Sequence, residues 1–94
     1  MNVKVLRMNT GEEVIFTLIE EDDNCIQVQN PLVAVPSPQG QVGFVPWSYL
    51  SKEDEVIDIP REYIVYVIEA RDEIVENYEK IFSPIQTTSK KLIL

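Results

Sequence analysis

Hydrophobic and polar positions alternate along most of this chain, which is the pattern of half-buried β-strands. The alternation is clearest at residues 25–30, where Ile26 and Val28 would face inward and Gln27 and Gln29 outward. Similar runs, rich in β-branched and aromatic residues, occupy residues 3–8, 13–20, 42–49, 56–59 and 62–69. The pattern therefore predicts a mainly β chain.

Turn-forming residues divide these runs. Gly11 lies in a polar turn after the first run, and residues 21–24 form a second polar turn. Pro31 donates no backbone hydrogen bond, so it breaks the hydrogen-bond ladder of the third strand, which resumes at residues 32–35 beyond a kink. Residues 36–40 contain two prolines and a glycine and predict a third turn.

One segment has the period of a helix instead. Within residues 71–82, four apolar side chains recur at helical spacing and form a single stripe. They are Ile74, Tyr78, Ile81 and Phe82. Acidic residues in the first turn and Lys80 near the end suit the helix dipole, and Pro84 ends the helix. We expect one domain over residues 1–83, closing with this helix, and a tail over residues 84–94.

The run at residues 62–69 is apolar on both faces, whereas a half-buried antiparallel strand has one polar face. The predicted helix would cover one face. A second copy of the chain would cover the other, or would pair with the open edge of the strand, which otherwise invites aggregation. The alternative is that the proline-rich loop and the tail cover it within one chain. The residues expected between copies are Tyr63, Ile64, Val65, Tyr66, Val67 and Ile68.

The composition excludes several classes of function. The chain has 94 residues, one cysteine and no histidine, so an internal disulfide, a histidine base and histidine metal ligands are excluded. Its net charge of −8, from 16 acidic and 8 basic side chains, opposes binding to a phosphate backbone. The sequence shows no glycine-rich phosphate loop, nucleophile elbow or converging pair of carboxylates. We expect neither enzymatic activity nor a cofactor.

The hydrophobic runs are too short for a membrane protein. None approaches the roughly 18 apolar residues that cross a bilayer. Residues 1–4 also lack the apolar stretch of a signal peptide. The sequence predicts a cytoplasmic protein with no membrane partner, whose acidity favours solubility.

Four short features have both a chemical and a structural interpretation. The acidic residues 20–23 lack the alternating ligands and the glycine of a Ca²⁺ loop, so we expect a solvated turn and no metal site. Cys25 has acidic neighbours that disfavour a thiolate, so it is expected to act as a small hydrophobe. Residues 51–55 predict an acidic surface loop. Residues 90–94, two lysines and three apolar residues, predict either a docking peptide for a partner or a frayed terminus.

Three aromatic residues stand close together in the fourth run. Phe44, Trp47 and Tyr49 would form a stacking surface for bases or for a proline-rich peptide. The alternative is that they belong to the core or to an interface between subunits. Stacking without a cationic groove is weak, so the second interpretation is favoured.

Two blocks of the chain carry spaced hydrophobic, glycine and charged residues. The first block, residues 3–30, has them at Leu6, Gly11, Val14, Leu18, Asp22 and Val28. The second block, residues 56–68, contains Ile59-Pro60-Arg61 followed by an apolar strand with tyrosines. Together they resemble the two motifs of the Sm-like (Lsm, Hfq) family. The resemblance implies a strongly bent five-stranded antiparallel barrel, here with a C-terminal helix, that assembles into a homo-oligomeric ring.

The same resemblance implies a site for single-stranded RNA at Asp22 and Arg61, near the inner rim of the ring. The chain departs from the family pattern at this site. Cys25 and Ile26 replace the methionine and asparagine of the family's Asp-x-x-Met-Asn turn. Pro60-Arg61 replaces the family's Arg-Gly pair and displaces the arginine by one position.

Two further departures concern the fold. Phe16 replaces a glycine that lets the second strand of the family bend. The helix follows the last strand, whereas the family has one before the first strand. The resemblance therefore supports the barrel and the ring more strongly than base recognition.

A second likeness is narrower. It lies at Asn30-Pro31, Pro36, residues 43–47, Tyr78 and Phe82. These positions resemble small Sm-like proteins of tailed phages that infect marine cyanobacteria. The likeness implies a viral origin, and hence the cytoplasm of a bacterial host, but no activity.

The sequence thus predicts an interaction module: an Sm-like ring of identical subunits that scaffolds a protein or nucleic-acid partner. The alternative is a protein that binds single-stranded RNA through Arg61, Lys90 and the three aromatic residues of the fourth run.

Overall fold

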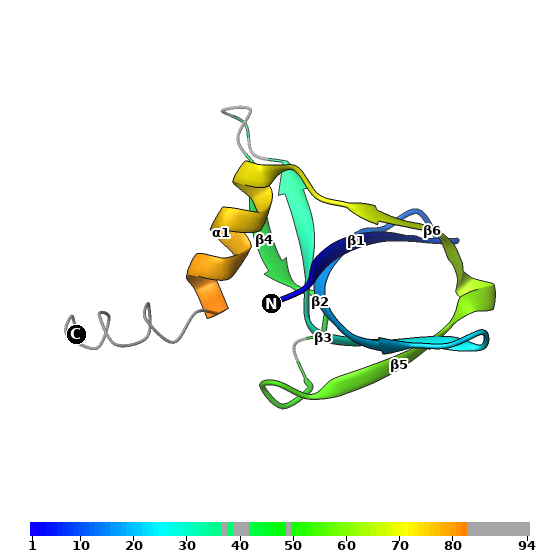
Figure 1. Ribbon diagram of the computed structural model, residues 1–94. Coiled ribbons are helices and arrows are strands. Elements are labelled where there is room, and N and C mark those ends of the chain that lie inside the picture. The colour runs from blue at the N-terminus through cyan, green and yellow to red at the C-terminus, as the bar shows by residue number, and fades with distance from the viewer. Residues whose placement is uncertain (37, 39–41, 49, 83–94) are drawn as a thin grey trace.

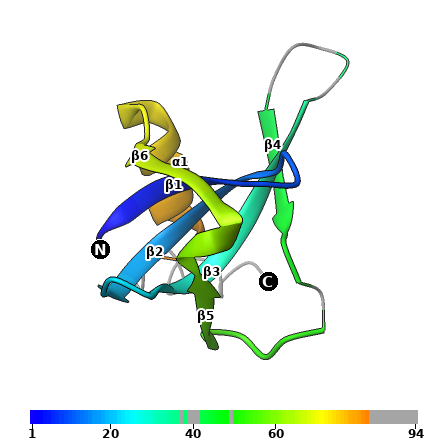
Figure 2. The same cartoon turned by 90° about the vertical axis from the view of Figure 1, so that its right-hand side faces the viewer.

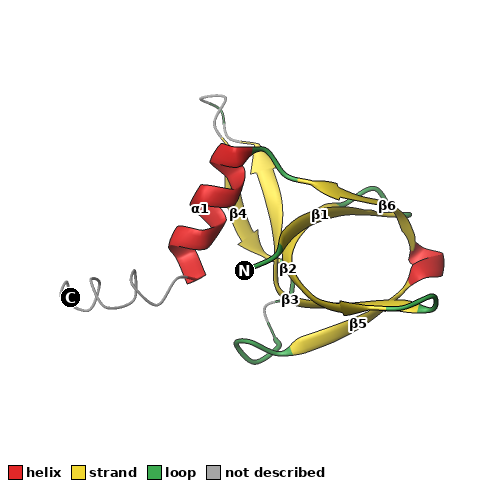
Figure 3. Cartoon of the chain, in the orientation of Figure 1, coloured by secondary structure: helices red, strands yellow, loops and turns green. Residues whose placement is uncertain are grey.

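In the computed structural model, the described residues are 1–36, 38, 42–48 and 50–82. The predicted tail and Tyr49 lie outside them. The elements, in chain order, are β1 (Val3–Met8), β2 (Glu13–Glu21), β3 (Cys25–Pro36), β4 (Val42–Pro46), β5 (Val56–Pro60), the 3₁₀ turn η1 (Arg61–Tyr63), β6 (Ile64–Glu69) and α1 (Asp72–Phe82) (Figure 3). The prediction of a mainly β chain that closes with one helix is confirmed.

All the strands join one antiparallel sheet in the order β4-β3-β2-β1-β6, and β5 also pairs with β3 (Figure 1). The sheet has six strands, so the predicted number of five is wrong. The number five comes from the Sm-like resemblance, whereas the hydrophobic pattern itself gives six runs. The strand β3 has 12 residues and serves two partners on the same edge. Residues 25–29 pair with β5, and residues 32–36 pair with β4.

The two halves of β3 meet at a bend. Asn30 has a φ of 52°, in the left-handed region, directly before Pro31. Asparagine tolerates this conformation better than most residues, and proline removes a donor at the same place. The kink that the sequence predicts at Pro31 is therefore present. Figure 2 shows β4 and the second half of β3 extending away from β5 beyond this bend.

The sheet is open. One of its edges is β6, which pairs with β1, and the other edge is formed by β4 and β5. Among the described residues no strand pairing joins β5 to β6, and η1 connects them along the chain (Figure 2).

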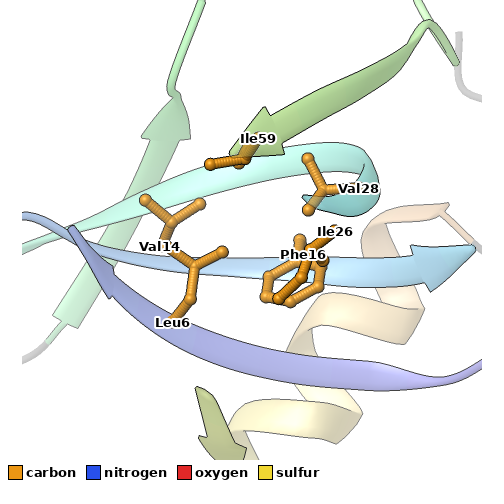
Figure 4. Packing of buried hydrophobic residues seen from close by; sticks show 6 residues of the cluster. All are labelled: Leu6, Val14, Phe16, Ile26, Val28 and Ile59. Atoms are coloured by element: carbon orange, nitrogen blue, oxygen red, sulfur yellow. The ribbon is translucent and has the colours of Figure 1, made fainter. Parts of the chain in front are cut away.

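The concave inner face of the sheet holds the main core. Its buried side chains come from β1, β2, β3 and β5 (Figure 4). They are Leu6, Val14, Phe16, Ile26, Val28 and Ile59. Phe16, which occupies the position where the Sm-like pattern has a glycine, is fully buried in this cluster. Full burial of such a side chain contributes about 1.5–3 kcal/mol.

The outer face of the sheet is covered in part by α1 (Figure 1). Tyr78 is fully buried there against Val3, Ile15 and Leu32, and its ring lies 4.8 Å from that of Phe82 between centroids. This contact holds the helix on the sheet.

The buried stripe of α1 differs from the predicted one at a single position. Ile74, Tyr78 and Phe82 contact the outer cluster as expected, but Val75 joins them and Ile81 is 53% exposed. A helix advances by about 100° per residue. The centre of the observed stripe therefore falls between Val75 and Tyr78, and Ile81 lies at its margin.

The last strand is apolar on both faces, and only one face is packed. Ile64 and Val67 contact the inner core. On the other side, Val65 is 61% exposed and Ile68 49%, and Tyr63, in η1, is 45% exposed. The helix α1 therefore leaves this part of the outer face uncovered. No helix among the described residues is long and apolar enough to cross a membrane.

Candidate functional site

Asp22 and Arg61, the two residues that the Sm-like resemblance marks, lie together although 39 positions separate them. Asp22 is in the turn between β2 and β3, and Arg61 begins η1 directly after β5. Because β5 pairs with the first half of β3, Cys25 is opposite Pro60, and Arg61 is brought beside the turn. The backbone N–H of Arg61 donates to the carbonyl of Asn24 at 2.9 Å.

The guanidinium of Arg61 bridges two groups of the turn. Its Nε donates to the backbone carbonyl of Asp22 at 2.6 Å, and its Nη2 lies 3.0 Å from the Glu21 carboxylate. All of these groups are at the surface, so the ion pair contributes little to stability. The ion pair instead orients the guanidinium of Arg61 and neutralises part of the positive charge of that group.

The carboxylate of Asp22 shapes its own turn. Its Oδ1 accepts hydrogen bonds from the backbone N–H groups of Asn24 at 2.8 Å and of Cys25 at 2.9 Å, the geometry of an Asx-turn. Both bonds favour the charged form and hold the pKa of Asp22 below its ordinary value. The carboxylate is therefore an anion that supports the loop.

Cys25 follows this turn, and its thiol is poorly suited to react. Partial burial raises the pKa of Cys25, and the negative charges of Asp22 and Asp58 raise it further. The reactive form of cysteine is the thiolate. The geometry thus favours the structural interpretation of Cys25.

The two described aromatic residues of the fourth run lie on opposite faces of the sheet. Phe44 packs against the outer cluster beside α1, and Trp47 packs against the inner core. The backbone N–H of Trp47 donates to the carbonyl of Pro31 at 3.0 Å. Phe44 and Trp47 therefore do not form a common stacking surface, and Tyr49 is outside the described residues.

A second polar cluster, which the sequence analysis did not identify, lies at the bend of β3. Gln29 Nε2 donates to the backbone carbonyl of Asp54 at 2.8 Å, and Asn30 Nδ2 donates to the Asp54 carboxylate at 3.1 Å. These bonds tie the acidic loop to the sheet. The sequence contains only an indirect signal for them, the amide side chains just before Pro31.

The tied loop forms one wall of a groove of about 420 Å³. We call it the acidic groove; its lining includes Pro31, Phe44, Pro46, Glu53, Glu55 and Phe82. A second cavity of the same size, about 420 Å³, opens on the outer face between β6 and the start of α1, and Ile68 and Ile74 line it. Both are bounded in part by Phe44.

Among the described ranges, no three His, Cys, Asp or Glu side chains are grouped so that they could hold a metal ion. No protein-family model matches the chain, and no curated protein is significantly similar to it. The function must therefore be inferred from the geometry of the sheet, its edges and the loops between its strands.

Proposed function

We propose that this protein is a non-enzymatic interaction module with an Sm-like barrel that assembles into a homo-oligomeric ring. The ring would scaffold a protein or nucleic-acid partner in the cytoplasm, that of a bacterial host if the chain is viral. The order of elements supports this proposal. Three antiparallel strands are followed by β4 and β5 on one edge of β3, a 3₁₀ turn, and a last strand that returns to β1.

The observation that carries the proposal is the surface of β6 that no described residue covers. Tyr63, Val65 and Ile68 expose large apolar side chains beside a strand edge whose partner on that side is absent among the described residues. An open, apolar edge favours pairing with another chain. The opposite edge of the sheet ends at β5, where Val56 is 40% exposed.

Pairing between these edges would be heterologous, because β6 of one copy would meet β5 of the next. A heterologous contact repeated around an axis closes into a ring when its rotation allows. Each contact would cover Val65 and Ile68 and complete the backbone hydrogen bonds of both edges.

The solution mass tests this proposal. The chain is 10.8 kDa, so light scattering at micromolar concentration should give a multiple of that mass. Replacing both exposed side chains of β6, as Val65→Lys with Ile68→Lys, should give a monomer, because charges would then face the partner edge. Ile19→Lys is the matched control, since Ile19 is 41% exposed on another strand, and it should leave the oligomer intact. A monomeric wild-type protein would overturn the proposal.

The contacts of the site groups support the non-enzymatic part of this proposal. The Asp22 carboxylate accepts two backbone N–H groups, and the raised pKa of Cys25 disfavours its thiolate. The chain has no histidine to serve as a base. These groups support a turn; they do not converge on a reacting atom.

A second function, binding of single-stranded RNA, is favoured by one observation: the closeness of Asp22 and Arg61. Two features oppose it, the pairing of Arg61 with Glu21 and the net charge of −8. Because cation–phosphate contacts release counterions, RNA affinity would fall steeply with salt.

Fluorescence anisotropy with short U-rich and A-rich RNA at low salt tests this second function. Arg61→Gln should abolish binding if Arg61 contacts RNA, whereas the exposed Arg71→Gln should retain it. Circular dichroism of both variants checks the fold. No binding by the wild-type protein at low salt would eliminate the RNA function and leave the ring proposal unaffected.

A further inference from the structure

We propose that the C-terminal segment of this chain, Lys90 to Leu94, binds in the acidic groove of its own subunit. The lysines would pair with Glu53 and Glu55, and the three apolar residues would cover the apolar floor. This contact is independent of the proposed ring and would exist in a monomer.

The groove has the two surfaces that such a segment requires. Its floor is apolar and is formed by Pro31, Phe44, Pro46 and Phe82. Its wall is the loop at residues 52–55, which carries three acidic side chains and one lysine, a net charge of −2. A peptide with positive charges followed by apolar residues therefore complements it.

The acidic wall is held in place by the sheet. Asp54 is anchored to β3 by hydrogen bonds from Gln29 and Asn30. Glu53 and Glu55, on either side, are exposed, and none of the ion pairs between described residues involves them. Their charges are thus available to a cationic ligand.

The C-terminal segment combines basic and apolar side chains without acidic ones. Residues 83–94 contain Lys90 and Lys91 and no acidic side chain. The remaining 82 residues have 6 basic and 16 acidic side chains, a net charge of −10, since the whole chain has 8 and 16. The segment therefore differs in charge from the body to which it is attached.

The attachment point favours the same subunit over a second copy. Phe82, the last residue of α1, lines the groove, so the segment starts at its rim. Seven residues separate Phe82 from Lys90, and an extended chain of this length reaches about 25 Å. A tether this short gives an effective concentration on the order of millimolar.

Zero-length cross-linking with a carbodiimide tests the contact, because it joins an amine to a carboxylate only where the two groups touch. Peptide mapping of the full-length protein should find amides between Lys90 or Lys91 and Glu53 or Glu55. Replacing both acids, as Glu53→Gln with Glu55→Gln, should remove these products. Glu73→Gln with Glu76→Gln, at exposed positions of α1, is the matched control and should leave the yield unchanged.

A second variant tests the apolar part of the contact. Leu92→Ser with Leu94→Ser keeps both lysines but removes two side chains that would cover the floor. The yield of the cross-link should fall about tenfold, since the apolar surface that the two leucines would remove from water is lost. An unchanged yield would show that the lysines reach the acids by charge alone and would overturn the proposed docking.

A mixture of isotopically labelled and unlabelled protein distinguishes a segment bound to its own subunit from a segment bound to a second copy. Cross-links within one isotope are expected at every protein concentration. Mixed products that dominate would overturn the proposal in favour of docking onto a second copy. Cross-links spread evenly over Glu62, Glu73 and Glu76 would overturn it altogether. The mass of the wild-type protein, measured in parallel, reports on the ring separately.

Discussion

At the residue scale, Tyr78 joins three elements through one hydroxyl group. Its Oη lies 2.9 Å from the Thr17 hydroxyl, and it donates toward the backbone carbonyls of Asn30 at 2.8 Å and Gln29 at 3.2 Å. These carbonyls lie at the bend of β3, where regular strand pairing is interrupted. Carbonyl groups that are shielded from water need partners, and Tyr78 provides a donor from α1 to these part-buried ones.

Removal of this hydroxyl should destabilise the protein. Tyr78→Phe keeps the ring in the outer cluster but removes a hydrogen-bond donor from two part-buried carbonyls, so we expect the free energy of unfolding to fall by about 1–3 kcal/mol. Tyr66→Phe is the matched control, because Tyr66 donates to the exposed Glu13 carboxylate, and its loss should cost less than about 1 kcal/mol. Urea unfolding of both variants measures the difference. Equal effects would show that the bend does not depend on Tyr78.

The same hydroxyl should make stability depend on pH in the alkaline range. Burial raises the pKa of Tyr78 to about 12, above the ordinary value near 10. The folded state therefore keeps its proton where the unfolded state has lost it. The contribution of Tyr78 is complete below pH 10 and is lost as the pH rises toward 12. The stability difference between wild type and Tyr78→Phe should shrink over this interval; a constant difference would contradict the shift.

At the element scale, the position of α1 distinguishes two isoleucines seven residues apart. Ile74 contacts the outer cluster, whereas Ile81 is 53% exposed. Ile74→Ala should lower the free energy of unfolding by about 1–3 kcal/mol, because it removes contacts between helix and sheet. Ile81→Ala has the same helix propensity change and should stay within about 0.5 kcal/mol. Denaturant titration of the pair tests which face of the helix is buried.

The strands were predictable from the sequence, but their partners were not. The period of two in residues 25–30 identifies the inward side chains Ile26 and Val28, and both are fully buried. The same period says nothing about which strand lies alongside, because alternation is a local property. The division of β3 between β4 and β5 therefore could not be deduced from the pattern, and the resemblance that gave five strands did not supply it either.

The candidate site, too, could be predicted only in part. The nearness of Asp22 and Arg61 was expected from a family resemblance, and the structure brings them together through the pairing of β5 with β3. The ion pair to Glu21 and the anchoring of Asp54 depend on side-chain contacts across loops, which carry no periodic signal. The prediction for Val75 and Ile81 was wrong because both lie near the margin of one helical stripe: Val75 packs on the outer cluster, and Ile81 is exposed.

At the scale of the whole molecule, the net charge opposes association between copies, and the apolar strand edge favours it. Each copy carries a net charge of −8, which repels other copies. The exposed side chains of Val65 and Ile68 favour association, because pairing would remove apolar surface from water. Assembly therefore requires that edge pairing outweigh repulsion, and the balance depends on ionic strength.

The two proposed functions predict opposite responses to salt. From 0.05 to 0.5 M NaCl the screening length falls from about 14 to about 4 Å, so repulsion between acidic copies weakens while apolar burial remains. The average mass at a fixed low micromolar concentration should then increase, whereas the affinity for RNA should decrease. Light scattering and anisotropy on one salt series measure both. A mass that falls with salt would show that ion pairs between copies hold the assembly together, and the apolar edge would lose its role in assembly.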